Sequence, residues 1–298
     1  MLSPASPVKQ DHLEKGCEEL SRLGYRPLVD RASALAQDGF FAGSTAARLA
    51  AFEQALTEPD SRAIFCSRGG YGSNYLLDGL RDAPRSPKIL LGSSDVTSLQ
   101  IFLWQKFGWV TFYGPMVAQN FDRGVSAPHG YDGTSLLHAL AEIKEGWRVA
   151  LDGEALVAGS AEGVLLGGCL TLVEATLGTP WELDTRGALL LLEDRAMKPY
   201  QVDRALTHLR QAGKFREVTG FLFGDFPECE PPPGSESVRD VARRILAPLG
   251  LPVVFGAPIG HTARAALTIP LGVRARLSAS RSPSAPLHLD ILEPACAA

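Results

Sequence analysis

Short apolar runs that end in glycine-rich turns, with helical segments between them, constrain the fold of this chain more than any other feature. The runs 63–66 and 88–91 are predicted strands, and helices are predicted after their glycine turns at 74–80 and 95–107. Strands separated by helices of this length pair in parallel through right-handed crossovers. The first half of the chain therefore predicts an α/β domain built on a parallel sheet.

The second half repeats this alternation. Strands are predicted at 188–192, 220–223 and 253–255, helices at 202–211 and about 237–246, and two closing strands between 273 and 291. The periodicity fades over 118–133, so we place the connection between there and about residue 153. The predicted fold class is α/β, with an N-terminal parallel-sheet domain over residues 1–140 and a smaller C-terminal α/β domain over residues 141–298.

The N-terminus departs from this pattern. Residues 1–8 are few and rich in proline. They predict either a stub in place of a full opening strand or a sheet that begins elsewhere.

Composition excludes several classes of partner. A net charge of -4 without clusters of Lys and Arg argues against nucleic acid. No apolar run approaches the roughly 18 residues of a membrane span, and the N-terminus lacks a basic region followed by an apolar run. We expect a cytoplasmic protein without a membrane partner. Five scattered cysteines without a C-x-x-C pair indicate reduced thiols rather than disulfides or zinc ligands.

Ser93 and Ser94 lie where the predicted strand 88–91 meets the helix 95–107, just after Gly92. A serine at such a junction has the placement of a nucleophile elbow, in which a sharp turn exposes the hydroxyl. The N-terminus of the helix then directs N–H groups toward the oxyanion that forms when the serine attacks a carbonyl. The same serines also suit a simple helix cap, and this segment alone does not decide between the two.

A serine nucleophile needs a base, and His261 differs from the other histidines. It follows the predicted strand 253–255 and the sequence Ala-Pro-Ile-Gly, which fixes the backbone before it. The others lie on predicted helices, in the connection or in a terminal strand: His12, His129, His138, His208 and His288. His261 is the candidate general base, and a structural turn residue is the alternative.

Glu193 and Asp194 are the candidates for the carboxylate that orients this histidine. Both follow the apolar run 188–192, where an acidic side chain is costly to bury without a partner. Neighbouring side chains of a strand point to opposite sides, so only one of the two faces a given site. The pattern alone does not choose between them.

Six spaced segments resemble the successive motifs of the L,D-carboxypeptidase family, which also contains the microcin C immunity peptidases. They occur in the family's order and span about residues 40 to 275. Six motifs in order are far more specific than any one of them. The segments are CSRGGYGSNYLLDGL, KILLGSSDVTSL, TFYGPM, LLGGCLTLVEATLGTPWELD, LLLLEDRAMKPYQVDRALTHLR and APIGHTARAALTIPLG.

The resemblance implies three catalytic residues. The family's pattern G-Y-S-D-x-T falls on residues 92–97, which makes Ser94 the nucleophile and puts Ser93 in place of the usual tyrosine. The family's L-E-D pattern makes Glu193 the orienting carboxylate, and its G-H pattern makes His261 the base.

The resemblance also implies a role for the turn 68–72, because in the family this turn lies against the elbow. The backbone N–H groups of Gly70 and Asp95 are the candidates for the oxyanion hole. A plain strand–helix turn would use the same glycines, whereas a dinucleotide loop fits less well because Tyr75 stands where a third glycine belongs. The candidates for binding the substrate are Arg68, Tyr71 and Arg195. The two arginines are also the candidates for binding its terminal carboxylate.

The function implied by the resemblance is hydrolysis of the amide that joins the L-centre of a diamino acid to a terminal D-alanine in a murein tetrapeptide. The site would lie between the two domains and would need no metal or organic cofactor. One alternative is an immunity-type peptidase that cleaves peptidyl- or aminoacyl-adenylate conjugates, and another is a non-catalytic nucleotide- or sugar-binding α/β protein. The expected partners are a small peptide substrate, either a murein peptide or a peptidyl-nucleotide, and a second copy of the chain in a homodimer.

Overall fold

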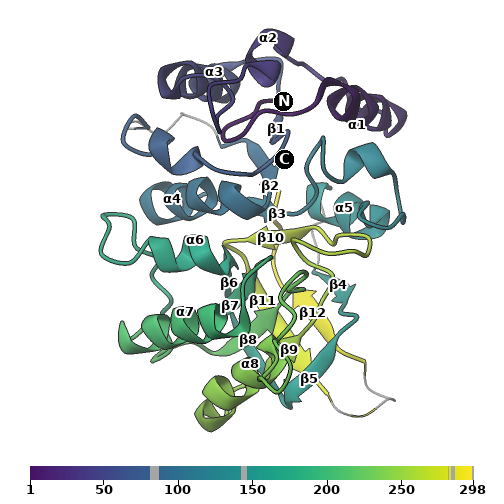
Figure 1. Cartoon of the computed structure of the whole chain (residues 1–298). Coiled ribbons are helices and arrows are strands. Elements are labelled where there is room, and N and C mark those ends of the chain that lie inside the picture. Colours follow the sequence, from purple (N-terminus) through teal and green to yellow (C-terminus); the bar gives the residue numbers. More distant parts are fainter. Residues whose placement is uncertain (81–86, 142–145, 281, 283–285, 297–298) are drawn as a thin grey trace.

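The computed structural model describes residues 1–80, 87–141, 146–280, 282 and 286–296. It confirms the α/β class and the two-part architecture, with a four-stranded sheet in the upper part of Figure 1 and an eight-stranded sheet in the lower part. The second part, expected to be the smaller, thus carries the larger sheet. Within the described ranges, no helix is long and apolar enough to cross a membrane.

The first sheet combines parallel strands from the N-terminal half with one strand from far along the chain. Its elements are α1 (Gln10–Arg22), α2 (Arg31–Leu35), α3 (Thr45–Thr57), β1 (Ala63–Phe65), η1 (Ser73–Leu76), β2 (Ile89–Gly92), η2 (Ser94–Val96), α4 (Thr97–Phe107), β3 (Thr111–Tyr113), η3 (Phe121–Arg123), α5 (Gly133–Leu140) and β10 (Ile269–Leu271). The strand order is β1–β2–β3–β10. The first three pair in parallel, as predicted, and β10 adds antiparallel to β3.

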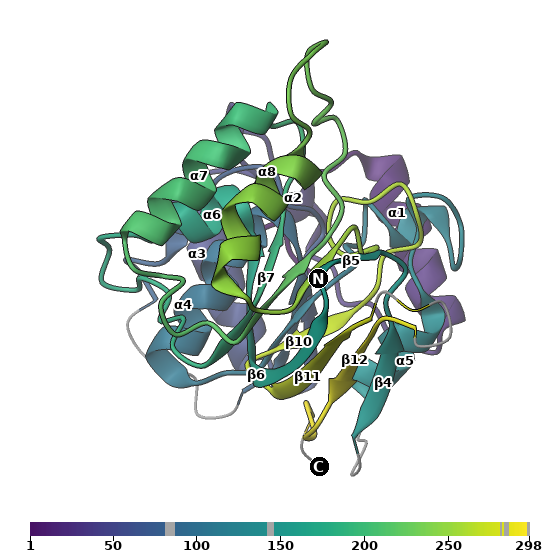
Figure 2. The same cartoon turned by 90° about the horizontal axis from the view of Figure 1, so that it is seen from below.

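The second sheet has the order β4–β12–β11–β6–β7–β8–β9–β5. The elements of this part are β4 (Trp147–Ala150), β5 (Glu154–Val157), β6 (Gly159–Cys169), α6 (Leu170–Ala175), β7 (Ala188–Glu193), α7 (Pro199–Gln211), β8 (Gly220–Phe223), α8 (Val238–Leu246), η4 (Ala247–Leu249), β9 (Val253–Phe255), β11 (Arg274–Ala279) and β12 (His288–Ile291). Strands β6 to β9 are parallel, and the remaining pairs are antiparallel. Figure 2 shows α6, α7 and α8 together on one side of this sheet.

Strand β7 lies at the centre of the second part and is buried on both faces. All six of its residues are buried, as expected of a parallel strand covered on both sides. Leu190 and Leu192 join the apolar cluster of α6, α7 and α8. Leu189 and Leu191 join the cluster on the opposite face, which includes residues of β10, β11 and β12. Period-2 alternation then sends the next odd-numbered residue, Glu193, toward that second face.

Two predictions about the N-terminal part had different outcomes. The helix predicted at 74–80 is wrong, because this segment forms only the 3-10 helix η1. The carboxylate of Asp95 accepts the N–H groups of Gly72 and Ser73, which fixes the start of the segment in a tight turn. The opening strand is a stub, one of the two stated alternatives, since only Leu2 bridges in parallel to Cys66.

The connection predicted between residue 118 and about residue 153 contains regular structure. Helix α5 begins within it, where the Asp132 carboxylate accepts the N–H of Ser135 at 2.6 Å, and β4 follows. Residues 142–145 of this connection lie outside the described residues. The domain division at 140/141 stays a prediction.

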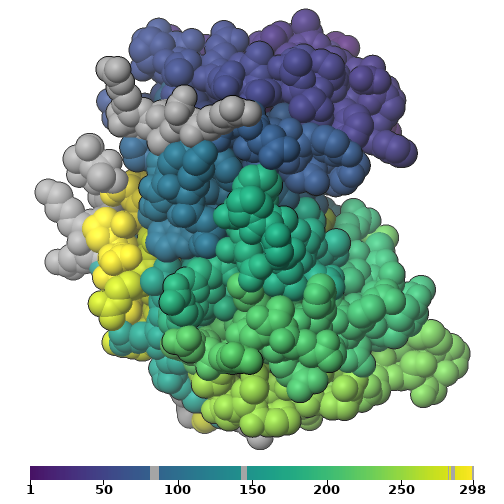
Figure 3. Space-filling view, turned by 90° about the vertical axis from the view of Figure 1, so that its left-hand side faces the viewer, coloured from purple at the N-terminus to yellow at the C-terminus, as the bar shows by residue number. Residues whose placement is uncertain are grey.

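The two parts meet where the start of α4 lies on the junction of β6 and α6. Thr97 Oγ1 accepts the N–H of Cys169 at 3.1 Å. Gly168 has a φ of 140°, and a Cβ there would lie 2.7 Å from Thr97 Oγ1 and 3.0 Å from Tyr113 Cε2. In Figure 3 the blue surface of the first part meets the green surface of the second without a break. The glycine therefore permits the close approach that brings the ends of β2, β3 and β7 together.

We expect Gly168→Ala to destabilise the protein by about 2–4 kcal/mol, because it adds an overpacked Cβ to an unfavourable φ. Gly178→Ala is the matched control, since Gly178 also has a positive φ, 75°, but no atom lies within 4 Å of a Cβ placed there. The control should lose about 1–2 kcal/mol from the backbone alone. Urea unfolding measures both, and equal losses would show that the junction yields to the added methyl group.

Candidate active site

Ser94 is the first residue of η2 and lies in the strained turn that follows β2. Its φ is 61°, a left-handed conformation that costs a non-glycine residue about 1–3 kcal/mol and persists only where contacts with the surroundings offset that cost. One such contact is the bond from the Ser94 N–H to the phenol oxygen of Tyr113, at 3.0 Å. At Gly92 a Cβ would lie 3.0 Å from Val96 and 3.1 Å from Cys66, so the preceding glycine lets the turn pack closely. This strand–turn–helix geometry matches the predicted elbow.

The two serines of the turn differ in backbone conformation. Ser93 is extended, with a φ of -148°, and its side chain does not cap the helix. Within the described part of the chain, Ser94 Oγ has no hydrogen-bond partner. Neither serine side chain therefore caps the helix, which was the alternative that the sequence left open. The structure links Ser94 to His261 through Tyr113 and Glu193, and no hydrogen bond joins the Ser94 and His261 side chains among the described residues.

Glu193 and His261 form a hydrogen-bonded pair at the carboxyl end of β7. Glu193 is fully buried, and the His261 side chain is 14% exposed. Glu193 Oε2 accepts the backbone N–H of His261 at 2.9 Å and its Nδ1–H at 2.8 Å. Because the carboxylate only accepts, Nδ1 carries the proton and Nε2 presents a lone pair. This is the tautomer that a general base requires.

Of the two candidate carboxylates, Glu193 and Asp194, it is Glu193 that contacts the His261 imidazole. Asp194 accepts bonds from the N–H and hydroxyl of Thr171 at 2.9 and 2.6 Å, which fixes the first turn of α6. Glu193 fits tightly beside the histidine because Gly260 has a φ of 73° and no side chain. A Cβ at Gly260 would lie 2.3 Å from Glu193 Cδ. The glycine before His261 is thus required by the buried carboxylate.

Tyr113 contacts both halves of the site, and the sequence reasoning did not identify it. Its phenol donates to Glu193 Oε1 and accepts the N–H of Ser94. Its side chain is fully buried at the end of β3, next to the end of β2. The signal available in the sequence was the run 109–113, whose last residue lies at the sheet edge where β2 ends.

The pKa of His261 reflects opposing effects. Burial of the imidazole lowers it, but the charge and hydrogen bond of Glu193 and the charge of Asp194 raise it, and the net direction is upward from 6.5. Arg195 lowers it by a smaller amount. The Glu193 carboxylate therefore favours the protonated imidazole, which a base must become during the reaction.

The glycine turn 68–72 lies against the elbow. A Cβ at Gly69 would lie 3.1 Å from Ser94 Oγ and 3.3 Å from the Asp95 nitrogen. Ser6, which the sequence did not single out, holds the turn by accepting the Tyr71 N–H at 3.1 Å and donating its own N–H to the Gly69 carbonyl at 3.2 Å. Among the described residues, the N–H groups of Gly70 and Asp95 have no acceptor. Both groups are therefore free to bind a further oxygen.

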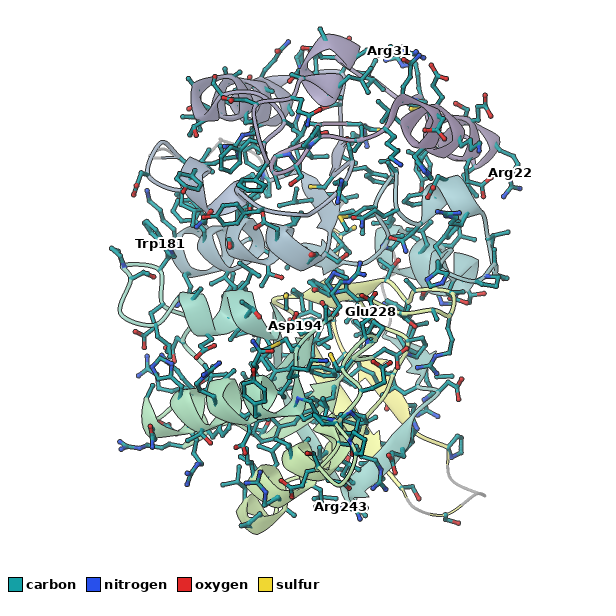
Figure 4. The ribbon with its side chains drawn as sticks, in the orientation of Figure 1. Arg22, Arg31, Trp181, Asp194, Glu228 and Arg243 are labelled. Atoms are coloured by element: carbon teal, nitrogen blue, oxygen red, sulfur yellow. The ribbon has the colours of Figure 1, made fainter. Side chains whose placement is uncertain are left out.

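A cavity of about 430 Å³ lies between the two parts and is lined by Ser93 and His261. Figure 4 labels Glu228, one of its lining residues, and Asp194 near the level where the parts meet. Arg68 and Arg195 also line it. Tyr71 does not line this cavity. Its side chain is 47% exposed and packs against Phe41 and Tyr75.

The cysteines and the acidic side chains suggest no other chemistry. All five cysteines are free thiols, and burial raises the pKa of the Cys66 thiol to about 12, which keeps it unreactive. No group of three or more His, Cys, Asp or Glu side chains in the described segments could hold a metal ion.

Comparison with known proteins identifies the family of the chain. The chain matches the family model of the LD-carboxypeptidase N-terminal domain over residues 1–114 and that of the LD-carboxypeptidase C-terminal domain over residues 162–277. A probable murein peptide carboxypeptidase of Bacillus subtilis is 34% identical over 283 residues, which cover 93% of this chain and 88% of that protein.

Solved structures resemble the whole chain. The muramoyltetrapeptide carboxypeptidase from Oxalobacter formigenes has a TM-score of 0.84 and 28% identity, covering 99% of this chain and 98% of its own. The microcin C7 self-immunity protein in complex with aspartyl sulfamoyl adenosine has a TM-score of 0.87 and 22% identity, with 99% and 96% covered. At that identity the second likeness concerns the fold alone.

The fold and these matches define the class of the protein as an α/β hydrolytic enzyme. The chain belongs to the LD-carboxypeptidase family, as the resemblance of its motifs predicted. Membership in a family of peptidases speaks against the alternative of a non-catalytic nucleotide- or sugar-binding protein.

Glu193→Gln should lower the pKa of His261 below its usual value, because burial remains while the charge that raises the pKa is lost. We expect a drop of about 1–3 pH units, measured by NMR titration of the imidazole C–H signals. Asp194→Asn is the control and should give a smaller drop, because Asp194 contributes less. An unchanged value in Glu193→Gln would contradict the assignment of this pair.

Proposed function

We propose that the protein is a serine peptidase that removes the terminal D-alanine of murein tetrapeptides by hydrolysing its amide with the L-centre of the diamino acid. The observation that carries this proposal is the buried Glu193–His261 pair beside the strained Ser94 turn, with Tyr113 bonded to both sides. Relatives named murein peptide and muramoyltetrapeptide carboxypeptidases support the substrate class.

In the first half of the proposed reaction, Ser94 Oγ attacks the amide carbonyl carbon while His261 Nε2 takes the hydroxyl proton. The carbonyl oxygen becomes an oxyanion, and the free N–H groups of Gly70 and Asp95 stabilise it. The C–N bond then breaks as the imidazolium gives its proton to the leaving amine, which departs as D-alanine. Glu193 holds the imidazole in place and stabilises its charge throughout.

In the second half, water hydrolyses the acyl-enzyme. His261 takes a proton from the water as it attacks the ester carbonyl, and the same N–H groups hold the second oxyanion. Collapse of this intermediate returns the proton to Ser94 Oγ and releases the shortened peptide.

Ser94→Ala should reduce kcat by about a thousandfold or more and leave the fold intact, because it removes the attacking atom. Ser93→Ala is the matched control, since Ser93 lies one residue earlier and lines the cavity. It should change kcat much less. Release of D-alanine from a murein tetrapeptide measures both variants, and equal losses would mean that the nucleophile is misassigned.

The charge of the cavity supports an anionic peptide as substrate. Its lining includes four cationic side chains, Lys9, Arg68, Arg123 and Arg195, against the single carboxylate of Glu228. This excess contrasts with the net charge of -4 of the whole chain. A desolvated guanidinium binds a terminal carboxylate more strongly than a neutral amide.

Arg68 is the better placed of the two candidate arginines. Arg195 is paired with Glu228. Arg68 donates from one terminal nitrogen to the Pro7 carbonyl at 3.2 Å, and its buried Nε has no partner among the described residues. It also directly precedes the glycine turn that lies against Ser94. We therefore propose that Arg68 binds the terminal carboxylate of the substrate.

Amidation of the C-terminal D-alanine should raise the barrier for cleavage by about 2–4 kcal/mol through lost charge-assisted contacts. Arg68→Met should erase most of this preference by slowing cleavage of the free acid. Arg195→Met is the comparison and should keep the preference. The kcat/KM values for acid and amide in each variant measure the effect, and equal cleavage of the two substrates by the unmodified enzyme would contradict an exopeptidase.

Equal cleavage of the free-acid and amidated peptides would instead favour the immunity-type alternative, in which the enzyme hydrolyses peptidyl- or aminoacyl-adenylate conjugates. The likeness to the microcin C7 self-immunity protein supports this alternative only through the shared fold. The cytoplasmic location and the homodimer expected from the sequence remain proposals. Light scattering of the purified protein measures its oligomeric state.

A further inference from the structure

We propose that Tyr113 is a positioning residue. Through its single phenol oxygen it holds the Ser94 turn and the Glu193–His261 pair in a fixed position relative to each other. This inference rests on the proposed function, because it assigns Tyr113 a part in the same reaction. Tyr113 is fully buried, and its phenol oxygen is already bonded to Ser94 and Glu193, so it would not touch the substrate.

The direction of each hydrogen bond of Tyr113 is fixed by its partner. A backbone N–H can only donate, so the phenol oxygen accepts from Ser94 at 3.0 Å. The Glu193 carboxylate accepts, so the phenol proton lies toward Oε1. Burial, the Glu193 charge and the nearby Cys169 raise the pKa of Tyr113, so the phenol keeps this proton.

The ring is held from both parts of the molecule. Tyr113 lies in β3, paired with Gly92 of β2 on one side and with Ile269 of β10 on the other. Gly168 of β6 leaves room for the ring, since a Cβ there would lie 3.0 Å from Tyr113 Cε2. A fully buried ring fixed in this way gives its oxygen a defined position between the two parts.

Loss of the phenol oxygen would act on both partners at once. The Ser94 N–H would lose the acceptor that helps to hold the residue at a φ of 61°. Glu193 would keep both of its bonds to His261 but lose the donor at Oε1. Its negative charge would then be less offset and would bind the imidazolium more strongly. The first effect lowers the rate, and the second moves the pH at which His261 becomes protonated.

The pH effect has a defined set of contributors. The titratable groups that act on His261 are Glu193, Asp194 and Arg195, and those that act on Tyr113 are Glu193 and the Cys169 thiol. Removal of the phenol hydroxyl leaves Asp194, Arg195 and Cys169 in place. Only the Glu193 interaction changes, so the pKa of His261 should rise further.

The test is Tyr113→Phe, assayed with the free-acid murein tetrapeptide. We expect kcat to fall roughly 10- to 100-fold, the change expected from losing one or two bonds to charged or strained groups. KM should stay within about twofold, because Tyr113 makes no substrate contact. The acid limb of the kcat/KM profile should move to higher pH, and NMR titration of His261 should show the same direction without any assay of activity.

Tyr131→Phe is the matched control. Tyr131 is also fully buried, and its phenol donates to a glutamate, Glu19, at 2.5 Å, but outside the site. This variant should lose similar stability and keep the parent kcat and acid limb. A merely structural role for Tyr113 would make the two variants alike.

Replacement of Tyr113 by 3-fluorotyrosine tests the inference if Tyr113→Phe folds poorly. Fluorine makes the phenol a stronger donor, so the acid limb should move to lower pH, opposite to Tyr113→Phe. An unchanged acid limb with fluorotyrosine, or parent-like kcat and acid limb in Tyr113→Phe, would overturn the inference. If Ser94→Ala retains full turnover, the proposed function fails instead, whatever Tyr113 does.

Discussion

The site depends on one buried carboxylate. Glu193 is fully buried at the end of a strand that is itself covered on both faces, where an unpaired charge would cost several kcal/mol. Three donors offset that cost: the backbone and imidazole N–H groups of His261 on Oε2, and the phenol of Tyr113 on Oε1. Any arrangement that breaks one of these three hydrogen bonds destabilises the buried carboxylate, so the charge imposes the geometry of its neighbours.

The same requirement explains how two halves of the chain come to share one site. His261 follows β9 in the second part, Tyr113 ends β3 in the first, and the phenol continues to the strained Ser94 turn. Glycines at the contact points allow the approach, since a side chain at Gly168 or Gly260 would occupy space needed by Tyr113 or Glu193. The carboxylate therefore links residues of both parts to the geometry of the Ser94 turn.

Much of this could be predicted from the sequence, because strand ends and glycines leave local signals. Ser94 and His261 each follow such a signal, and the family motifs select them. The choice of Glu193 over Asp194 could not be derived from pattern, because β7 is apolar on both faces and its sequence does not indicate which face meets the site. β10 was missed because it is three residues long and contains Pro270, which suits only an edge strand.

The most direct test is covalent labelling with a fluorophosphonate, which reacts only with a serine whose hydroxyl is activated by a base. The adduct is located by mass spectrometry of peptides, in the parent protein and in His261→Ala. We expect one adduct, on Ser94, that forms more slowly as the pH falls through the raised pKa of His261 and is lost in the variant. Labelling of Ser93, or labelling of Ser94 at the same rate without His261, would contradict the assignment of the site.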